Sequence, residues 1–408
     1  MLQKDIEKWY PLAIDTIYGG FFSDINYKWE LAGAQNKFIV TQARHIWTCA
    51  KLSEFYHNDY YTKIAKHGFE FLKNVMWDKK YGGFFDLVTR KGKPIKENNK
   101  IIKKAYGHAF VIYGLSAYFE VSNDSSALKL AQKTFEWLEN HSYDTIYGGY
   151  FQFISEKGEP FVNGYNGTPP KDYNSMIHIL EAYTELYKTW KNEKLKERLT
   201  SLFYLIRDKV TTDKGYMRLY FQRDWTPVEF NYSSTDKNKN FLLDHVSFGH
   251  DIETAYLLLE AAEILGIKDS LTIIKAKTMV NHTISNGWDS FNGGIFDAGY
   301  YFKDKDSITI IKNTKEWWSQ AEALNSFLLM SELFPEDRVV YYNYFKSQWE
   351  YIKKYLIDNI NQGWFIGGID IVPENKFSPK STIWKCNYHT TRALINCINT
   401  LERNNNYK

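Results

Sequence analysis

The sequence predicts an all-α protein, a single (α/α)6 barrel in which six helical hairpins form a closed toroid with short β-hairpin arms. Two observations lead to this prediction. A glycine-aromatic motif recurs six times, and two stretches with apolar residues at three- and four-residue spacing lie between consecutive copies. A helix pair cannot bury its apolar faces alone, so six pairs must stack as a solenoid or close into a ring.

The motif reads YGGFF in its first two copies and YGGYF in the third, and then becomes KGYMRLYF, NGGIF and IGGI. Its first glycines lie 63 to 78 residues apart, at Gly19, Gly82, Gly148, Gly215, Gly293 and Gly367. A Gly-Gly pair followed by alternating aromatic residues is typical of a turn into a short strand. Each copy is therefore predicted to form a small hairpin arm that closes a helix pair.

Apolar spacing also locates the helices. We expect them at about 37–57 and 61–76, 104–121 and 125–140, 172–190 and 195–209, 249–265 and 269–285, 315–333 and 340–358, and 386–402. A helix over 4–16 would supply the missing partner of the last stretch. Because the N-terminus then completes the final pair, closure is favoured over an open solenoid with polar caps. We expect residues 1–408 to form one domain.

The segments after the hairpin arms are long and polar, at 91–104, 155–171 and about 222–246. Long loops inside a compact domain are often functional, although Lys- and Asn-rich insertions can equally be solvated surface. We expect these loops to gather at one mouth of the barrel.

Composition narrows the class of ligand. With 51 basic and 48 acidic side chains, the net charge of +3 gives no electrostatic reason to expect nucleic acid or a membrane as a partner. Aromatic residues make up 17% of the chain, including 13 Trp and 31 Tyr. Such rings either stack on the apolar faces of sugars or fill a wide helical core. A small neutral sugar is the partner that we expect.

Cysteine usage and the N-terminus indicate the compartment. Cys49, Cys386 and Cys397 form no C-x-x-C pair and leave an odd number, so neither a disulfide framework nor a structural zinc site is indicated. The sequence begins without an apolar run of signal-peptide length and holds no apolar stretch long enough to cross a bilayer. We expect a cytoplasmic protein that is a monomer or homodimer.

Polar and aromatic residues recur near the first turns of the helices that follow the long loops. They are Arg44, Tyr106, Asn174, His178, His250, Glu253, Trp318, Glu322, Trp384, His389 and Arg392. Spacings of three or four residues place several of them on a shared helix face. Burying so many polar groups without mutual partners or a ligand would cost free energy, so a pocket on the barrel axis is predicted.

Two simpler interpretations compete with this pocket. A single histidine on an apolar helix is more often a satisfied core residue than a catalyst. The pair His250 and Glu253 resembles half of a di-iron site, but its order is reversed and no second copy exists. The sequence also lacks H-x-H and H-E-x-x-H. We therefore predict neither a metal nor a cofactor.

The segments QARHIW, YGHAF, NSMIHILEAYT, SFGHDIE, WWSQAEA and WKCNYH occur in this order over essentially the full length. On these segments the chain resembles the N-acylglucosamine 2-epimerase and cellobiose 2-epimerase family. The WW-x-QAE string and the spacing of Trp384 and His389 are most similar to cellobiose 2-epimerases. Two positions depart from the pattern: His108 stands where many cellobiose enzymes have Gln, and Asn387 where Pro is common.

The resemblance implies that His250 and His389 are the acid/base pair of a sugar 2-epimerase, which converts cellobiose to 4-O-β-D-glucosyl-D-mannose. The chemistry agrees with this choice. Epimerisation removes the C2 proton beside the C1 carbonyl and returns a proton to the opposite face through an enediolate. Because the ordinary pKa of histidine is about 6.5, one ring can accept while the other donates near neutrality.

Other residues are expected to bind the charged intermediate. Negative charge develops on O1 and O2 of the enediolate, so cationic or N–H donors should be fixed there. Arg44 and His178 are the candidates, with Tyr106 and Asn174 as neutral donors.

The remaining residues are expected to hold the sugar or a catalytic ring. Trp318 and Trp384 would stack on sugar rings, with Trp384 on a second glucose beyond the reacting one. Glu322 would bind a sugar hydroxyl. Glu253 would orient His250 through one ring nitrogen.

Three other functions stay open at the level of sequence. The first is a monosaccharide enzyme, either a mannose 2-epimerase or isomerase or an N-acylglucosamine 2-epimerase, because outer subsites alone separate these substrates. The second is an (α/α)6 glycoside hydrolase, which needs two carboxylates about 6.5–9.5 Å apart for inversion. The candidates would be Glu253, Glu322, Asp172 and Asp251. The third is a carbohydrate-binding protein without activity.

Overall fold

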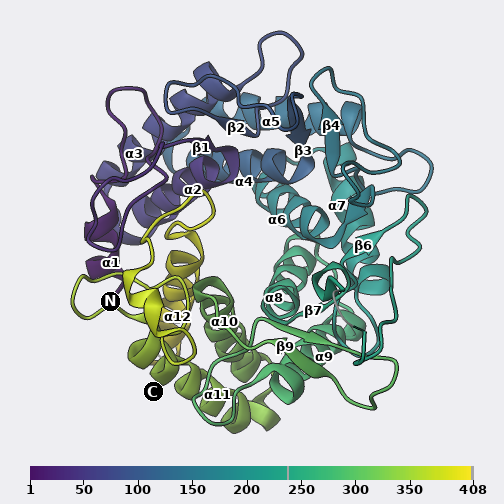
Figure 1. Ribbon diagram of the computed structural model, residues 1–408. Coiled ribbons are helices and arrows are strands. Elements are labelled where there is room, and N and C mark those ends of the chain that lie inside the picture. The colour runs from purple at the N-terminus through teal and green to yellow at the C-terminus, as the bar shows by residue number, and fades with distance from the viewer. Residues whose placement is uncertain (237–238, 406–408) are drawn as a thin grey trace.

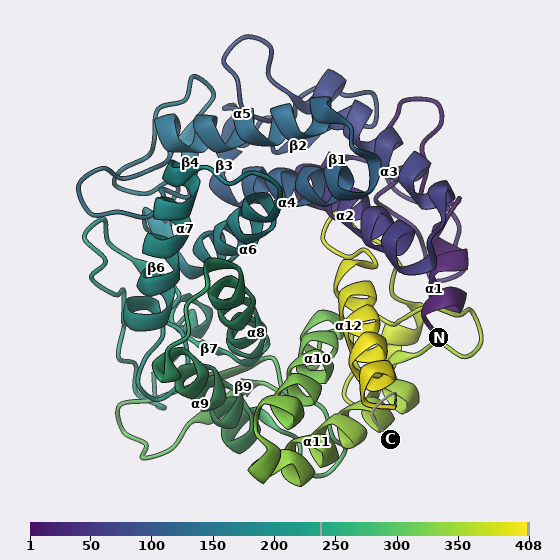
Figure 2. The same cartoon turned by 180° about the vertical axis from the view of Figure 1, so that it is seen from behind.

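The computed structural model describes residues 1–236 and 239–405, and its helices form two concentric rings (Figures 1 and 2). The α-helices are α1 Leu2–Trp9, α2 Ile39–Tyr56, α3 Asp59–Phe71, α4 Ala105–Ser122, α5 Ser125–His141, α6 Tyr173–Thr189, α7 Glu193–Leu205, α8 Phe248–Leu265, α9 Ser270–Gly287, α10 Trp317–Leu333, α11 Arg338–Tyr351 and α12 Tyr388–Asn405. The even-numbered helices form the inner ring. Each contacts the next, and α12 contacts α2, so the predicted (α/α)6 barrel is confirmed.

The helix predictions agree with the structure except at the N-terminus. Instead of a helix over 4–16, α1 ends at Trp9, and Tyr10 is extended. Pro11 explains the early end, because a proline disfavours the helical conformation of the residue before it. The shorter helix still contacts α12 and fills the twelfth place in the double ring.

Outer helices differ from inner ones at their ends. Three outer helices continue into a single π-helical turn, at Leu72–Met76, Ile206–Val210 and Ile352–Leu356. Short 3-10 helices lie at Phe241–Leu243, Pro335–Asp337 and Pro373–Phe377.

Short strands lie where the inner helices begin (Figure 1). They are β1 Lys37–Phe38, β2 Leu87–Val88, β3 Ile102–Lys104, β4 Phe153–Ser155, β5 Lys171–Asp172, β6 Tyr220–Phe221, β7 Val246–Ser247, β8 Ala298–Tyr300 and β9 Thr309–Lys312. They pair antiparallel as β1-β2, β3-β4, β5-β6 and β7-β8-β9. The strand before an inner helix pairs with the strand after the next glycine-rich turn, so the pairing joins the two ends of a helix hairpin.

Each glycine motif forms a tight turn at the end of an outer helix. In the first copy Ile14 bridges Phe21, and Gly19 and Gly20 have φ angles of 78° and 66°. A Cβ at Gly20 would lie 2.5 Å from Oε1 of Gln42, so only glycine fits. The same side-chain oxygen accepts a hydrogen bond from the backbone N–H of Phe21 at 2.7 Å.

The sixth copy of the motif is not at Gly367, as the sequence suggested. The turn is formed by Gln362 and Gly363, and Ile357 bridges Trp364. Gln362 takes the place of the first glycine with a φ of 68°, which an L-residue adopts at a cost in energy. The missing Gly-Gly pair hid this copy.

A buried Lys–Asp pair ties most of these turns to the next inner helix. Asp15 accepts from two backbone N–H groups of its turn, and Lys37 of β1 donates to Asp15 at 3.0 Å and to the carbonyl of Gly19. Equivalent pairs are Asp78–Lys103, Asp144–Lys171, Asp289–Lys315 and Asp358–Lys380. These pairs fix the entrance of the inner helices, from which the site residues project.

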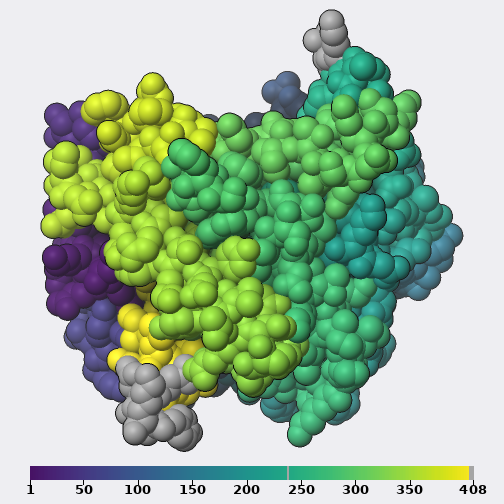
Figure 3. Space-filling model, turned by 90° about the horizontal axis from the view of Figure 1, so that it is seen from below, coloured from purple at the N-terminus to yellow at the C-terminus, as the bar shows by residue number. Residues whose placement is uncertain are grey.

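The two faces of the ring differ. Seen from the side, a teal-green segment projects from the upper edge of the ring (Figure 3). Within residues 1–236 and 239–405, none of the helices combines the length and the apolar character needed to span a membrane.

Candidate active site

A cavity of about 290 Å³ lies at the end of the barrel where the inner helices begin. It is lined by Arg44, Tyr106, Asn174, His178, His250, Glu253, Glu316, Trp317, Trp318, Trp384 and His389. All of the predicted site residues except Glu322 and Arg392 line it. Because the first turns of the inner helices point their N–H groups toward this end, the cavity carries a positive partial charge that favours negative charge on a ligand.

His250 lies in the first turn of α8, and its Nδ1 atom is held by two hydroxyl groups. The Tyr173 hydroxyl lies 2.9 Å from Nδ1 and the Ser247 hydroxyl 2.7 Å. The expectation that Glu253 orients His250 was therefore wrong. The three-residue spacing puts both side chains on one face of α8, but Tyr173 of the neighbouring inner helix reaches the ring instead.

His389 lies in the first turn of α12 and is held by a carboxylate. Its Nδ1 atom lies 2.7 Å from Oε1 of Glu322, a residue of α10 that is completely buried. Glu322 was expected to bind a sugar hydroxyl. The structure instead places it behind His389, where it also accepts from Nη2 of Arg392 at 2.7 Å.

The Arg392 guanidinium is buried and joins carboxylates from three inner helices. It donates to Glu181, Glu253 and Glu322 and lies 2.5 Å from the Tyr388 hydroxyl. Burial disfavours the charged form of Glu181, but Arg392 and His178 outweigh it and lower the pKa of Glu181 to about 2. Burial and the adjacent Glu322 instead raise the pKa of Glu253 to about 7.

Three ligand atoms in this cluster have a spacing that could hold a metal ion. Glu253, Glu322 and His389 each offer one atom, all within 4.8 Å of one another. Nη2 of Arg392 already donates to both of these carboxylates. A positive charge therefore occupies the place where a metal ion would bind.

The opposite wall of the cavity carries Arg44, Tyr106 and His178. Nη2 of Arg44 lies 3.3 Å from the Tyr106 hydroxyl, and the guanidinium lies over the Phe110 ring with 4.3 Å to its centroid. Nδ1 of His178 lies 2.9 Å from Oε2 of Glu181. Both predicted anion-binding side chains are therefore fixed by buried neighbours and directed at the same cavity.

Two tryptophans lie beside the rings of His250 and His389. The Trp318 ring lies between the two histidines, with its centroid 4.5 Å from that of His250 and 5.7 Å from that of His389. Its indole N–H donates to Glu316 at 2.8 Å, which fixes the ring. Trp384 is 53% exposed and packs on Phe38 with 4.6 Å between ring centroids. Trp384 thus stands at the mouth of the cavity.

Burial disfavours the protonated form of both histidines. Burial lowers the pKa of His250 well below 6.5, and the charges of His178, His245 and Arg44 act in the same direction. Burial also lowers the pKa of His389, with Arg44 and Arg392 adding to the effect. Within the described residues, Nε2 of neither ring has a hydrogen-bond partner. This nitrogen is therefore the atom that each ring offers to a ligand.

Several residues that the sequence singled out are structural. Nε2 of His108 accepts from the backbone N–H of Phe84 at 2.9 Å, and its ring stacks on Trp137. His108 therefore accepts a backbone hydrogen bond from the glycine turn of its repeat, as Gln42 does in the first repeat. It lies outside the cavity. Asp172 caps α6, and Asp251 accepts from the backbone N–H of Met217. Neither of these two candidate hydrolase carboxylates lines the cavity.

Sequence reasoning missed the residues that support the histidines. Tyr173 and Ser247 contact His250, Glu181 contacts His178, and Tyr388 donates to Glu181, all from behind the cavity. Tyr173 directly precedes the NSMIHILEAYT segment and Ser247 is the first residue of SFGHDIE, yet nothing in their spacing shows that they meet His250 from two different elements.

The fold and the cavity define a class of protein. A closed (α/α)6 barrel with histidine, arginine and tryptophan side chains gathered at one end of its axis is a carbohydrate-active helical barrel. Comparisons with known proteins agree. The chain is 31% identical to cellobiose 2-epimerase of Ruminococcus albus over 96% of its own length and 94% of that protein. Cellobiose 2-epimerase of Bacteroides fragilis is 27% identical, with the same two coverages.

A solved structure gives the same result. The structure of cellobiose 2-epimerase from Spirochaeta thermophila superposes with a TM-score of 0.83 at 29% identity and covers 98% of this chain and 94% of that one. The profile of the N-acylglucosamine 2-epimerase family matches residues 20–393, and the chain belongs to that family. It is a carbohydrate epimerase, an enzyme of the isomerase class.

Proposed function

We propose that this enzyme is a cellobiose 2-epimerase that inverts C2 of the reducing-end sugar by proton transfer between His250 and His389. The observation that carries the mechanism is the matched arrangement of the two rings. Each is held at Nδ1 from behind, lines the same cavity and contacts Trp318. Two bases facing one carbon from opposite sides are what inversion of a C–H centre requires.

The reaction begins from the open-chain aldose. One histidine accepts the C2 proton at Nε2, and the electron pair of the C–H bond moves into the bond between C1 and C2, leaving negative charge on O1. The other histidine, protonated, gives a proton to the opposite face of C2 as the C1 carbonyl re-forms. The pair therefore works with one proton shared between the two rings.

The two rings are supported in different ways. Glu322 accepts from Nδ1–H of His389, which leaves a lone pair on Nε2 and stabilises the imidazolium that forms after proton capture. His250 is held by two hydroxyls, which can donate or accept. His389 is therefore the stronger base of the pair, and His250 is the ring that adapts its tautomer.

The enediolate is stabilised by fixed positive charge. Arg44 stays protonated and lines the cavity, and the first turns of the inner helices add their N–H dipoles. Tyr106 and Asn174 supply neutral hydrogen-bond donors on the same side. Such preorganised groups lower the barrier most when charge develops next to them.

The choice of a disaccharide depends on Trp384. Its exposed ring stands at the mouth of the cavity, where the second glucose of a disaccharide would extend from the reacting sugar. Curated relatives that match nearly the whole chain at 27–31% identity bear the name cellobiose 2-epimerase. A monosaccharide would leave the Trp384 face without a partner.

Incubation with cellobiose in D2O tests the proposal. Proton NMR should show 4-O-β-D-glucosyl-D-mannose with deuterium at C2 and no free glucose. Mannose and N-acetylglucosamine, assayed in parallel, should react with a kcat/KM at least about tenfold lower. Release of glucose from cellobiose, or a preference for either monosaccharide, would contradict the proposal.

A further inference from the structure

A second cavity lies at the opposite end of the barrel, where the inner helices end. Its volume of about 650 Å³ exceeds the 290 Å³ of the active-site cavity. It is lined by residues from the middle to the last turns of α2, α6 and α8, by Tyr113 in the middle of α4 and by α12, and Trp47, Tyr113 and Tyr256 contribute aromatic surface. We call it the rear cavity. The mechanism above assigns it no role.

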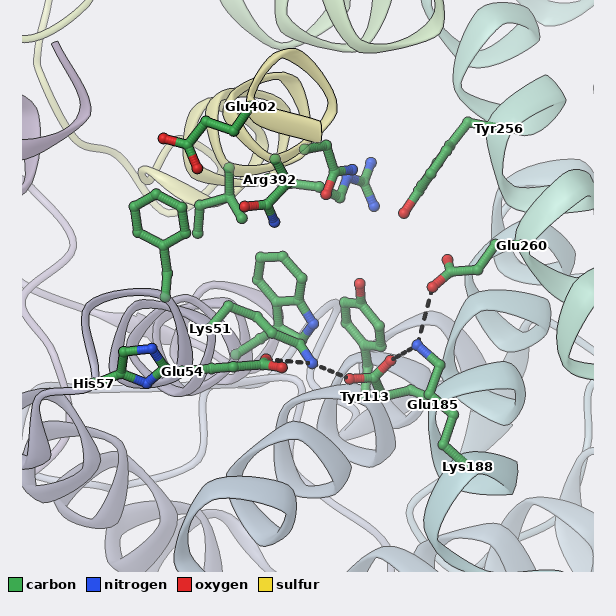
Figure 4. A pocket seen from close by; sticks show the side chains of 15 residues that line it. Lys51, Glu54, His57, Tyr113, Glu185, Lys188, Tyr256, Glu260, Arg392 and Glu402 are labelled. Carbon is green, nitrogen blue, oxygen red and sulfur yellow. Dashed lines mark hydrogen bonds and ion pairs between the residues drawn. The ribbon is translucent and has the colours of Figure 1, made fainter. Parts of the chain in front are cut away.

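One wall of the rear cavity is a chain of ion pairs (Figure 4). Lys51 lies 3.4 Å from Glu54 and 3.0 Å from Glu185, and Lys188 lies 2.7 Å from Glu185 and 3.0 Å from Glu260. Arg392 and Glu402 of α12 lie across the cavity from this chain (Figure 4). The lysines are thus held by carboxylates, and the cavity lining holds four carboxylates against two ammonium groups and one guanidinium.

Buried donors along the same cavity have no hydrogen-bond partner among the described residues. These are the indole N–H of Trp47, which is 5% exposed, and Nε of Arg392, which is 1% exposed. An adjoining compartment of about 570 Å³ shares Tyr256 and Asn399 with the rear cavity and is lined by Asn325, whose Nδ2 is also unpartnered. Buried donors of this kind normally find an acceptor.

The chemistry of the walls selects the charge of a ligand. An anion would meet an excess of carboxylates and the negative partial charges of the helix C-termini, so it is disfavoured. A simple cation would leave the indole of Trp47 and Nε of Arg392 without an acceptor. A hydroxyl group both accepts from these donors and donates to the carboxylates. The aromatic rings suit the apolar faces of a sugar.

We propose that the rear cavity is a second binding site, separate from the active site, for a neutral polyhydroxylated ligand of mono- to disaccharide size. Trp47, Tyr113 and Tyr256 present rings to it, and Asn399 and Glu402 bind its hydroxyls at the open side. The site does not depend on which sugar the active site epimerises, since the two cavities share no residue.

The rear cavity reaches the catalytic machinery through one side chain. Arg392 lines the rear cavity and donates to Glu322, which holds Nδ1 of His389. A ligand hydroxyl that binds Nε of Arg392 therefore lies one hydrogen-bonded residue from the carboxylate that supports a catalytic base.

Calorimetry with cellobiitol tests the proposal, because this reduced disaccharide has no C1 carbonyl and cannot be epimerised. The wild-type enzyme should bind two molecules per chain. The Asn399→Trp variant places an indole at the exposed rim of the rear cavity and should bind one. Lys129→Trp, which adds the same side chain on the exposed face of α5, is the matched control and should bind two.

A second variant, Trp47→Phe, tests the proposal even if Asn399→Trp fails to fold. Trp47→Phe keeps a ring and removes only the N–H donor, so it should weaken one of the two binding events by about tenfold. A single site in the wild-type enzyme that Asn399→Trp leaves intact would overturn the proposal. So would unchanged stoichiometry in Asn399→Trp together with unchanged affinities in Trp47→Phe. Tetramethylammonium binding that Asn399→Trp abolishes, without cellobiitol binding there, would reassign the cavity to cations.

Discussion

The two ends of the barrel axis are built from the same six helices but have opposite electrostatic properties. At the end where the helices begin, burial and nearby arginines lower the pKa values of His250 and His389. At the end where they finish, burial opposes the charged form of Lys51, but Glu185 and Glu120 outweigh it and raise its pKa. The lysines in turn lower the pKa of Glu185 to about 2.

This difference shows how helix direction divides the work in a toroid. The helix N-termini and Arg44 favour a developing negative charge, which is what an enediolate needs. The helix C-termini favour cations. Lysines are fixed at this rear end, and carboxylates neutralise their charge. We therefore propose that proton transfer takes place at the end with the histidines, and the predictions below test that proposal.

The largest effect is expected from the two histidine rings that we propose as the acid and the base. Replacing His250 or His389 with Asn should lower kcat by at least about a hundredfold, because general acid/base catalysis is lost. The measurement is steady-state epimerisation of cellobiose. His108→Gln is the control: this buried histidine lies outside the cavity and should retain most activity. Near-normal turnover in either Asn variant would remove that ring from the mechanism.

A smaller effect on kcat is expected from replacing Glu322, the carboxylate that contacts His389. Glu322→Gln removes the carboxylate from Nδ1, so kcat should fall by roughly 10- to 100-fold while KM changes little. Glu139→Gln provides a matched control, because Glu139 is also buried and paired, with Arg198 at 2.7 Å, but lies in an outer helix. A larger kcat loss in Glu139→Gln than in Glu322→Gln would refute the positioning role.

The mouth of the cavity should affect binding and not chemistry. Trp384→Ala is expected to raise KM for cellobiose by about tenfold through lost stacking, with little change in kcat. KM for mannose should stay within about twofold, since a monosaccharide does not reach this ring. Equal effects on both sugars would place Trp384 against the reacting glucose.

The pH profile should show the smallest change from ordinary histidine behaviour. Because burial lowers both histidine pKa values, the base form persists in mild acid. The acid limb of kcat/KM should therefore have an apparent pKa below 6.5, measured at fixed ionic strength. An apparent pKa above 6.5 would mean that a nearby negative charge, not balanced by a cation, raises the pKa of the catalytic base.

The sequence predicted the barrel because apolar spacing and a repeated motif are local signals. It failed where a local signal was replaced or partners came from elsewhere. Gln362 took the place of a glycine, so a later Gly-Gly pair was chosen for the sixth turn. The shared helix face of His250 and Glu253 was correct, but Arg392 reaches Glu253 from α12 and Tyr173 reaches His250 from α6. Such pairings depend on how neighbouring helices pack.

The isotope distribution at early reaction times tests the two-histidine mechanism most directly. Cellobiose is converted in D2O, and both epimers are recovered after a few per cent turnover and analysed by proton NMR. Two bases predict a mannose-type product that is fully deuterated at C2 and remaining cellobiose that still carries protium. Product that retains the original proton at C2 would mean that a single base moves it between faces, which would contradict the assignment of His250 and His389.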